Sequence, residues 1–487
     1  MTTTAPDTKS GVNVVAELAA AVGPENVLHR AEDLLLYEYD GSVARRRPDA
    51  VVFPASTQEV VEVVNIARAR GIPVVARGAG TGLAGGCIPL KGGIVLSTAR
   101  MNRIISIDYR NMIAVVEPGV VNLDLTAEVA PRGFQYVPDP SSEKASTIGG
   151  NVATNAGGPH TLAYGVTTNH ILELEVVTPQ GEVVTCGGAA IDAPGYDLRG
   201  VIVGSEGTLA IVTRITVRLV HSSESVRTLL AVYDSVDEAT ATVSDIIAAG
   251  IIPAAMELMD RTCTRAVAKW LPSARLPTDA GAILIIEVEG LQDGIDDQAA
   301  SVDSICRANG ATEIRIASKG SQRNSLWAAR KGAFGAIGVL APNYYVQDGV
   351  IPRTRLPDVL RSVNEIGREY GFEVANVFHA GDGNIHPLIL FDEREEGALE
   401  RVMSAGKKIL QACLDVGGTL TGEHGIGMEK IHQMPELFSE PDLDAMLKIR
   451  DVFSMDKRFN PGKIFPGPET ADHADTFGTA AVDVGAK

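Results

Sequence analysis

The chain has 487 residues, more than one hydrophobic core fills, so at least two domains are expected. Its composition is that of a globular protein, with 45% hydrophobic and 21% charged residues, and 61 acidic residues against 43 basic ones. The net charge of −18 argues against a protein that binds nucleic acid or anionic membrane. An anionic substrate would therefore need a local cluster of positive charge.

Cysteine usage and apolar runs narrow the class further. The five cysteines include no Cys-x-x-Cys pair, so we expect neither a disulfide framework nor an iron–sulfur or structural zinc site. Residues 1–9 are polar and lack the apolar segment of a signal peptide. No apolar run reaches the roughly 18 residues of a transmembrane helix. We therefore expect a cytoplasmic protein without a transmembrane segment, which would meet the membrane only through a partner.

The first regular elements form a β-α-β unit. Residues 51–54 predict a strand, and Ser56 with Glu59 predicts a capping box at the start of a helix. Gly71 ends that helix, and residues 72–77 predict the next strand. Farther along, short β-type runs alternate with Gly-rich turns, and they occupy residues 93–97, 114–117, 172–178 and 209–219.

Beyond a polar, Ser-rich boundary at residues 221–226, strands and helices alternate. Strands are predicted at residues 228–233, 282–289 and 311–317, and a helix capped by Ser235 and Glu238 runs to Gly250. The last elements are a hairpin made of residues 374–379 and 385–391, a helix over 397–416, and a small, polar tail after residue 467 that we expect to be disordered.

Three Gly-rich loops interrupt the first half of the chain. Residues 80–85 match the pattern Gly-x-Gly-x-x-Gly, but no helix follows and no acidic residue lies between Gly85 and Asp108, so a Rossmann site is rejected. A single such loop could equally be a set of tight turns. Further loops at residues 147–158 and 204–208 favour backbone amides that bind the phosphates of a large cofactor.

A second pattern lies in two Gly-rich segments near the C-terminus. His379 and His386 flank the predicted hairpin turn, and Glu423 with His424 lies in a loop too rich in glycine to be helical. Two histidines and one carboxylate leave an open coordination position, as in catalytic metal sites, and this set suits Zn, Mn or Fe. The alternative is a set of hydrogen-bonded loop histidines, and sequence spacing leaves open whether the two segments meet.

The order of the Gly-rich loops, with Pro138-Asp139-Pro140-Ser141-Ser142 between them, resembles the FAD-binding domain of the vanillyl-alcohol oxidase / p-cresol methylhydroxylase superfamily. Some members bind the flavin covalently through a histidine of the first loop. This loop has Thr81 and no histidine, so the resemblance implies non-covalent FAD. The residues that the resemblance assigns to the cofactor are Arg77, Gly78, Gly80, Thr81, Gly82, Pro138, Asp139, Thr147, Gly149, Gly150, Asn155, Gly157, Glu206, Gly207, Ile211 and Asn460.

Residues 378–386, 422–427 and 460–463 extend the resemblance over nearly the whole chain, to the FAD-linked subunit of bacterial glycolate oxidase and to D-lactate dehydrogenases. It implies that His379, His386 and Glu423 bind a divalent metal, that His424 is the catalytic base, and that Arg330 grips the substrate carboxylate. D-2-hydroxyglutarate dehydrogenases carry a Thr and a Lys where this chain has Phe334 and residues 344–346. A second substrate carboxylate would therefore find no partner.

The resemblance implies an α+β fold. It consists of a two-part FAD-binding domain of the p-cresol methylhydroxylase type (residues 1–222), an α+β cap domain with a largely antiparallel sheet (223–408), and a C-terminal segment that completes the site and packs on the FAD domain (409–466), before the tail (467–487).

The expected reaction is oxidation of glycolate or D-lactate to the 2-oxo acid, with hydride transfer to flavin N5. The electron acceptor stays open between a partner subunit, a quinone and oxygen, and a homodimer also stays open. Alternatives are a D-2-hydroxyglutarate dehydrogenase, a non-catalytic FAD subunit for electron transfer, and a metal-dependent hydrolase. No His-Glu-x-x-His or Gly-x-Ser-x-Gly motif supports the hydrolase.

Overall fold

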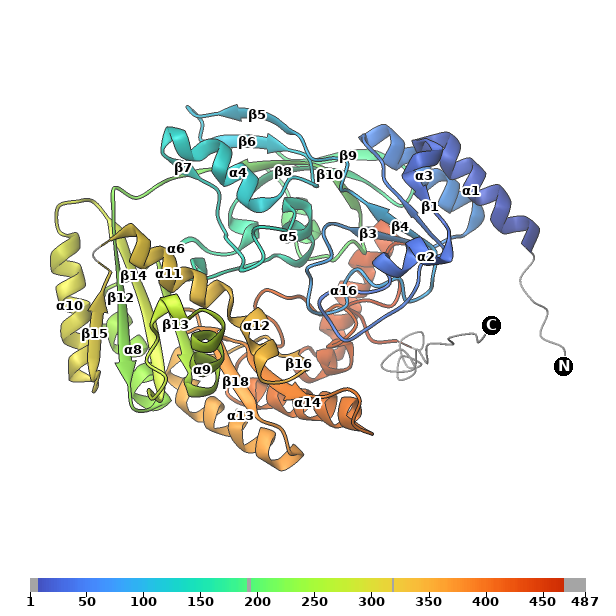
Figure 1. The fold of residues 1–487 in the computed structure, drawn as a ribbon. Helices are drawn as coiled ribbons and strands as arrows, with labels where there is room; N and C mark the ends of the chain where they lie inside the picture. The colour runs from blue at the N-terminus through green and yellow to red at the C-terminus, as the bar shows by residue number, and fades with distance from the viewer. Residues whose placement is uncertain (1–7, 191–193, 318, 468–487) are drawn as a thin grey trace.

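The computed structural model describes residues 8–190, 194–317 and 319–467, with the backbone alone for residues 8–13. The predicted tail from residue 468 onward lies outside the described residues. The described chain forms two halves, each with helices packed on β-sheets, and a C-terminal segment that runs from the second half back to the first (Figure 1). Within the described ranges, no helix combines the length and the apolar character needed to cross a membrane.

The predicted β-α-β unit is confirmed in the first, four-stranded sheet. β2 (Ala50–Val52) and β3 (Val74–Arg77) both run parallel to β4 (Ile94–Ser97), which lies between them, and α3 (Thr57–Arg70) connects them. The fourth strand, β1 (Val27–Leu28), pairs with β2.

The start of α3 differs slightly from the predicted capping box. The Ser56 hydroxyl accepts from the Glu59 amide as expected, but the Glu59 carboxylate accepts from the amide of Ala55 rather than of Ser56. Gly71 ends the helix in the left-handed conformation at φ 64°, which a residue without Cβ adopts without strain.

A second, antiparallel sheet follows in the order β5-β6-β10-β8-β9. Its central strands match predicted runs: β6 (Ile113–Val116), β8 (Ile171–Val177) and β10 (Ile211–Arg218). The two edge strands, β5 (Ile104–Asp108) and β9 (Val183–Gly187), were not predicted. Their residues are mostly exposed or half-buried, so their apolar signal is weak.

The C-terminal half is built on a nine-stranded sheet in which every recorded strand pair is antiparallel, as expected for the cap domain. Its strands are β12 (Ser225–Tyr233), β13 (Ala255–Asp260), β14 (Ala282–Gly290), β15 (Glu313–Ile316), β16 (Asn343–Val346), β17 (Gly349–Val350), β18 (Val374–His379), β19 (Asn384–Ile385) and β20 (Pro387–Phe391).

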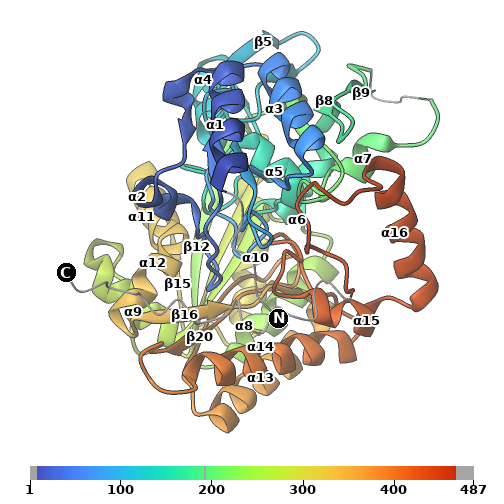
Figure 2. The same ribbon diagram turned by 90° about the vertical axis from the view of Figure 1, so that its right-hand side faces the viewer.

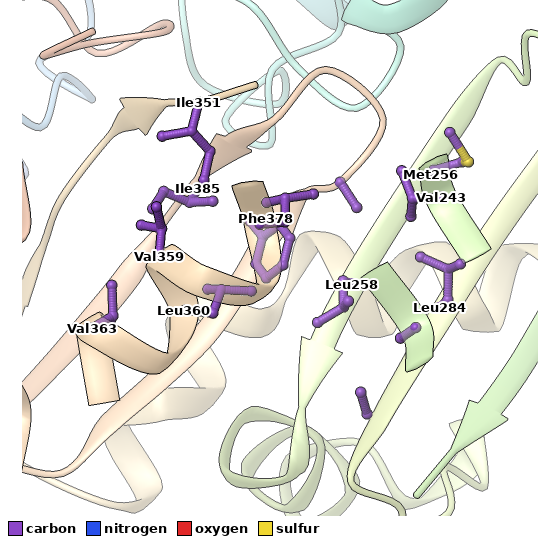
Figure 3. Packing of buried hydrophobic residues seen from close by; sticks show 14 of the residues in the cluster. Val243, Met256, Leu258, Leu284, Ile351, Val359, Leu360, Val363, Phe378 and Ile385 are labelled. Atoms are coloured by element: carbon purple, nitrogen blue, oxygen red, sulfur yellow. The ribbon is translucent and has the colours of Figure 1, made fainter. Parts of the chain in front are cut away.

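Helices cover both faces of this sheet (Figures 1 and 2). One face packs against α8 (Val236–Ala248), α10 (Ile295–Ala308), α13 (Leu356–Tyr370) and α14 (Ala398–Asp415). In that core Leu258, Leu284 and Phe378 lie between the strands and the helices (Figure 3). The other face packs against α9 (Arg261–Trp270), α11 (Gly320–Lys331) and α12 (Ala333–Ala336). Strand residues therefore alternate between two apolar cores.

After α14 the chain returns to the N-terminal half along α16 (Glu440–Phe453), which Figure 2 shows at the side of the molecule. Phe459 forms a parallel bridge with Val74 of β3, and the Asn460 amide donates to the Val74 carbonyl. The Asn460 side chain also donates to the carbonyls of Gly86 and Glu206. The C-terminal segment thus extends the first sheet by backbone hydrogen bonds.

A polar network joins the two halves. Lys331, at the end of α11, pairs with Asp139 at 2.9 Å and with Glu143 at 2.7 Å. His160 lies 2.8 Å from Asp139 and 3.5 Å from Glu287 of β14. Burial opposes protonation of His160, but Asp139 and Glu287 raise its pKa to about 10. His160 is therefore a cation at neutral pH, and it is held between carboxylates of both halves.

We expect His160→Gln to destabilise the protein by about 1–3 kcal/mol at pH 7, because two buried carboxylates lose a charged donor. The folded pKa lies above the value of about 6.5 for an unfolded histidine. This contribution is therefore fully present below about pH 6.5 and is lost as the pH rises through about 10. Urea unfolding of both proteins at pH 7 and pH 10.5 measures the effect. An equal difference at the two pH values would contradict it.

Candidate functional site

The site forms where one face of the nine-stranded sheet changes from apolar to polar. The part packed on α9, α11 and α12 carries residues such as Ile285, Val377 and Leu388. Two positions away from these residues lie Glu287 on β14, His379 on β18 and His386 just before β20, all buried. The strands thus present their polar side chains together at the end of the sheet nearest the N-terminal half.

The predicted hairpin holds the two histidines. β18 pairs with β19 and β20, with Asn384, rather than His386, directly opposite His379. The imidazole rings still meet, with centroids 5.1 Å apart at 89°. Glu423 Oε1 lies 3.3 Å from His379 Nε2 and 3.1 Å from His386 Nε2. The structure therefore brings together the three residues that the sequence suggested as metal ligands.

Asp348, a residue that sequence reasoning missed, holds the loop that carries Glu423 and His424. Its fully buried Oδ2 accepts from the Thr421 hydroxyl at 2.5 Å and from the backbone amides of Gly422, Glu423 and His424 at 2.9–3.2 Å. Burial opposes ionisation, but nearby cationic groups hold the pKa of Asp348 well below its usual range. Three successive amides on one carboxylate oxygen fix the course of the loop.

His424 lies at the edge of this cluster. Its ring stacks on that of His386, with centroids 4.9 Å apart at 9°, and its Nε2 lies 3.8 Å from Glu423 Oε1. Burial lowers the pKa of His424 to about 4. The imidazole is therefore neutral at pH 7 and can accept a proton. The side chains of Glu423 and His424 remain 14% and 10% exposed, more than those of the other two histidines, so a substrate would reach the cluster from their side.

The cluster has the donor set of a metal centre. Ligand atoms of His379, His386 and Glu423 lie within 4.8 Å of one another, and a second such group combines Asp348, His386 and His424. Among the described residues neither buried ring nitrogen of His386 makes a hydrogen bond, although Nε2 lies 3.1 Å from Glu423 Oε1. A buried imidazole without hydrogen bonds is costly unless an ion or another ligand satisfies it. The residues present therefore fit a divalent metal at a His₂–carboxylate site.

Arg330 lies behind the histidines on α11 and is 2% exposed. Its Nε lies 2.5 Å from Glu257 Oε2, and its Nη2 lies 3.4 Å from His379 Nδ1. The chain thus places the Arg330 guanidinium beside His379 in the histidine cluster. Arg330 is already paired with Glu257, so a substrate carboxylate would have to share the guanidinium with that residue.

The Gly-rich loops of the N-terminal half adjoin each other and the cluster. A Cβ on Gly78 would lie 2.4 Å from Thr147 Oγ1, so the first loop touches the second where Thr147 caps α5 (Ile148–Thr154) and accepts from Gly150. A Cβ on Gly157 would lie 3.0 Å from Glu423 Oε2. The absence of a side chain there allows the second Gly-rich loop to approach the cluster of His379, His386 and Glu423 directly.

The side chains of two other residues assigned to the cofactor, Glu206 and Asp139, also contact protein groups. The Glu206 carboxylate accepts from the amides of Ile426 and Gly427. Asp139 pairs with His160 and Lys331, as described above.

The remaining members of the set lie in the loops or the core beside them. Two of them make side-chain contacts: Arg77 contacts Cys87 and the Tyr37 ring, and Asn155 accepts from the Thr168 amide. Others make backbone contacts, namely the Pro138 carbonyl with Asn122, the Gly82 carbonyl with Gly41, and Gly149 with Pro118. Ile211 lies in the core between the two sheets, Gly80 and Gly207 have positive φ, and Thr81 is half-buried in the first loop.

Two sequence families match the chain. Residues 48–187 match the family described as "FAD binding domain", and residues 222–464 match "FAD linked oxidases, C-terminal domain". The glycolate oxidase subunit GlcD of Escherichia coli strain K12 is 44% identical over 455 residues, which cover 93% of this chain and 91% of that protein. A D-lactate dehydrogenase of Anaerostipes hadrus is 32% identical, with 86% and 90% covered.

A solved structure also shares the fold. p-Cresol methylhydroxylase with substrate bound superposes with a TM-score of 0.80 at 15% identity, over 94% of this chain and 98% of that chain. Together with the two family matches, this shared fold confirms the expected combination of an FAD-binding domain and an α+β domain with antiparallel strands.

We expect Asp348→Asn to destabilise the protein by at least the roughly 1.5–3 kcal/mol of one hydrogen bond to a charged group, because several donors lose a charged acceptor. Urea unfolding of the holoprotein measures the change. Asp303→Asn, which removes an exposed pair with Arg307 on α10, should change stability by less than about 0.5 kcal/mol. Equal effects of the two substitutions would contradict the role of Asp348.

Proposed function

The chain belongs to the family of FAD-linked oxidases that includes the bacterial glycolate oxidase subunit GlcD, and we propose that it oxidises a short 2-hydroxy acid, glycolate or D-lactate, to the 2-oxo acid. The observation that carries this proposal is the contact between Gly157 of a cofactor-binding loop and Glu423 of the histidine cluster. It brings the FAD-binding half to the residues best suited to act on a hydroxyl group.

When bound, FAD accepts the hydride from C2 of the hydroxy acid, and a divalent metal polarises the hydroxyl group. His379, His386 and Glu423 hold the metal. His424, neutral at pH 7, takes the hydroxyl proton. Arg330 provides the positive charge for the substrate carboxylate, and Glu257 shares it. We propose non-covalent FAD because the first loop carries Thr81 and no histidine.

The substrate is proposed to be short because aromatic rings line one side of the cluster. The Phe334 ring lies edge-on to His386, with centroids 5.9 Å apart, and 6.2 Å from the Tyr344 ring. Neither side chain carries a positive charge that could bind a second carboxylate group of a substrate. A D-2-hydroxyglutarate dehydrogenase is therefore the less favoured alternative.

The reduced flavin needs an electron acceptor. None of the five cysteines, all of which lie in the described chain, forms a disulfide, and neither possible metal group contains a cysteine. We propose that electrons leave to a partner subunit or a quinone, because the 44%-identical relative is named as a subunit.

Anaerobic mixing of the purified holoprotein with a panel of acids tests the proposed function. We expect glycolate or D-lactate to bleach the flavin absorbance fastest, with D-2-hydroxyglutarate lower in kcat/KM because its second carboxylate meets Phe334. A higher kcat/KM for D-2-hydroxyglutarate would refute the proposed specificity. A yellow protein that no acid bleaches would point to a non-catalytic electron-transfer subunit, and a colourless active one to a hydrolase.

The variants His424→Ala and Glu423→Ala distinguish the proposed base, His424, from the proposed metal ligand, Glu423. We expect His424→Ala to keep FAD and metal and to reduce its flavin about 10²–10⁴-fold more slowly, the usual contribution of a positioned base. Glu423→Ala should instead lose metal occupancy. Stopped-flow flavin reduction with metal analysis measures both. Wild-type reduction by His424→Ala would place the base elsewhere, and loss of its metal would make His424 a ligand, as in the group with Asp348.

A further inference from the structure

Glu257 lies at the centre of the site, although the proposed reaction assigns it no proton and no bond to substrate. It is 1% exposed, and both of its carboxylate oxygens lie near His379 Nδ1, at 2.8 Å and 3.0 Å. Oε1 lies 2.8 Å from His379 Nδ1, and Oε2 lies 2.5 Å from Arg330 Nε. One buried carboxylate thus contacts both the proposed metal ligand and the proposed substrate-binding cation.

The register of the sheet fixes this contact. Glu257 on β13 is directly opposite His379 on β18, and the next pair is Leu258 with Phe378. Side chains at opposed positions of antiparallel strands lie on the same face and touch. Leu258 and Phe378 point into the other core (Figure 3). A slip of one residue would bury the Glu257 carboxylate in that apolar core, so the core packing locks the pair in place.

The hydrogen bond decides which nitrogen of His379 faces the cluster. A carboxylate accepts only, so Nδ1 carries the proton that it donates to Glu257. The lone pair of a neutral His379 then lies on Nε2, which points to Glu423 at 3.3 Å. Arg330 Nε lies 2.5 Å from the other side of the Glu257 carboxylate, so the guanidinium offsets the buried negative charge.

We propose that Glu257 is a positioning residue for the metal: it sets the tautomer and the ring orientation of His379 and raises the basicity of Nε2. A carboxylate behind a ligating histidine acts in this way in metal sites, and its loss weakens metal binding about 10–100-fold. The inference rests on the proposed metal site, so the experiment measures metal binding apart from turnover.

The test is calorimetric titration of Zn²⁺ into metal-free, FAD-loaded protein. Glu257→Gln keeps an oxygen that can accept from Nδ1 but loses the charge, and Glu257→Ala loses both. We expect affinity to fall about 10-fold in Glu257→Gln and toward about 100-fold in Glu257→Ala. Excess Zn²⁺ should restore much of the flavin reduction rate, whereas it would not repair a merely structural defect.

Glu287→Gln is the matched control. Glu287 is buried on the adjacent strand β14, and its partners are Thr228, His160, Arg323 and Trp327 instead of the cluster. We expect this variant to be less stable yet to bind Zn²⁺ within about twofold of the wild-type affinity. Flavin content and circular dichroism establish the fold of each variant beforehand. If Glu257→Gln does not fold, Glu257→Asp, one methylene shorter, should give an intermediate affinity.

Wild-type affinity in Glu257→Gln or Glu257→Asp would overturn the inference, and so would an equal loss in Glu287→Gln. A wild-type protein that binds no Zn²⁺ would overturn the proposed metal site itself. The two failures are distinguishable because the wild-type titration precedes the variants.

Discussion

Asp348 is fully buried, so hydrogen-bond donors of the protein must take the place of water around its carboxylate. The donors come mainly from residues 421–424, more than seventy positions later in the chain, and from Asn384 of β19. This single requirement joins the two segments that carry the ligand candidates. Without the Asp348 carboxylate, residues 421–424 would lose four hydrogen bonds that position Glu423 beside the two histidines of the hairpin.

The same principle recurs around the site. Glu257 is satisfied by His379 and Arg330, and Glu206 by the amides of Ile426 and Gly427. Each buried carboxylate ties together parts of the chain that are distant in sequence. Removing one partner would leave a buried charge uncompensated, which is why such groups fix geometry more strongly than apolar contacts do.

The histidine cluster is nevertheless incomplete as a hydrogen-bonding system. Among the described residues the two buried ring nitrogens of His386 make no hydrogen bond, although Nε2 lies 3.1 Å from Glu423, whereas both ring nitrogens of His379 lie within hydrogen-bond distance of a carboxylate. An apolar core would not retain such a side chain, since an unsatisfied imidazole costs free energy. The sheet therefore provides rigid support for an arrangement that gains stability when a ligand binds, as is common for functional sites.

The sequence alone determined the local elements and the residue types of the site. The β-α-β unit, the hairpin, α14 and the Gly-rich loops follow from periodicity, capping residues and glycine spacing, which are properties of neighbouring residues. The motifs at residues 379–386 and 422–427 identified the residues that the structure brings into one cluster. Edge strands β5 and β9 escaped prediction because exposed strands lack a continuous apolar pattern.

Only the tertiary structure identified Glu257 and Asp348 as parts of the site. Glu257 lies in the buried strand β13, which the sequence did not predict, and its contacts depend on the register between β13 and β18. Asp348 lies outside every motif, and Arg330 gained its carboxylate partner only through the packing of α11 on the sheet. Such contacts join residues far apart in sequence, and no local pattern encodes them. They are decided by which strands pair and by the need to satisfy every buried charge.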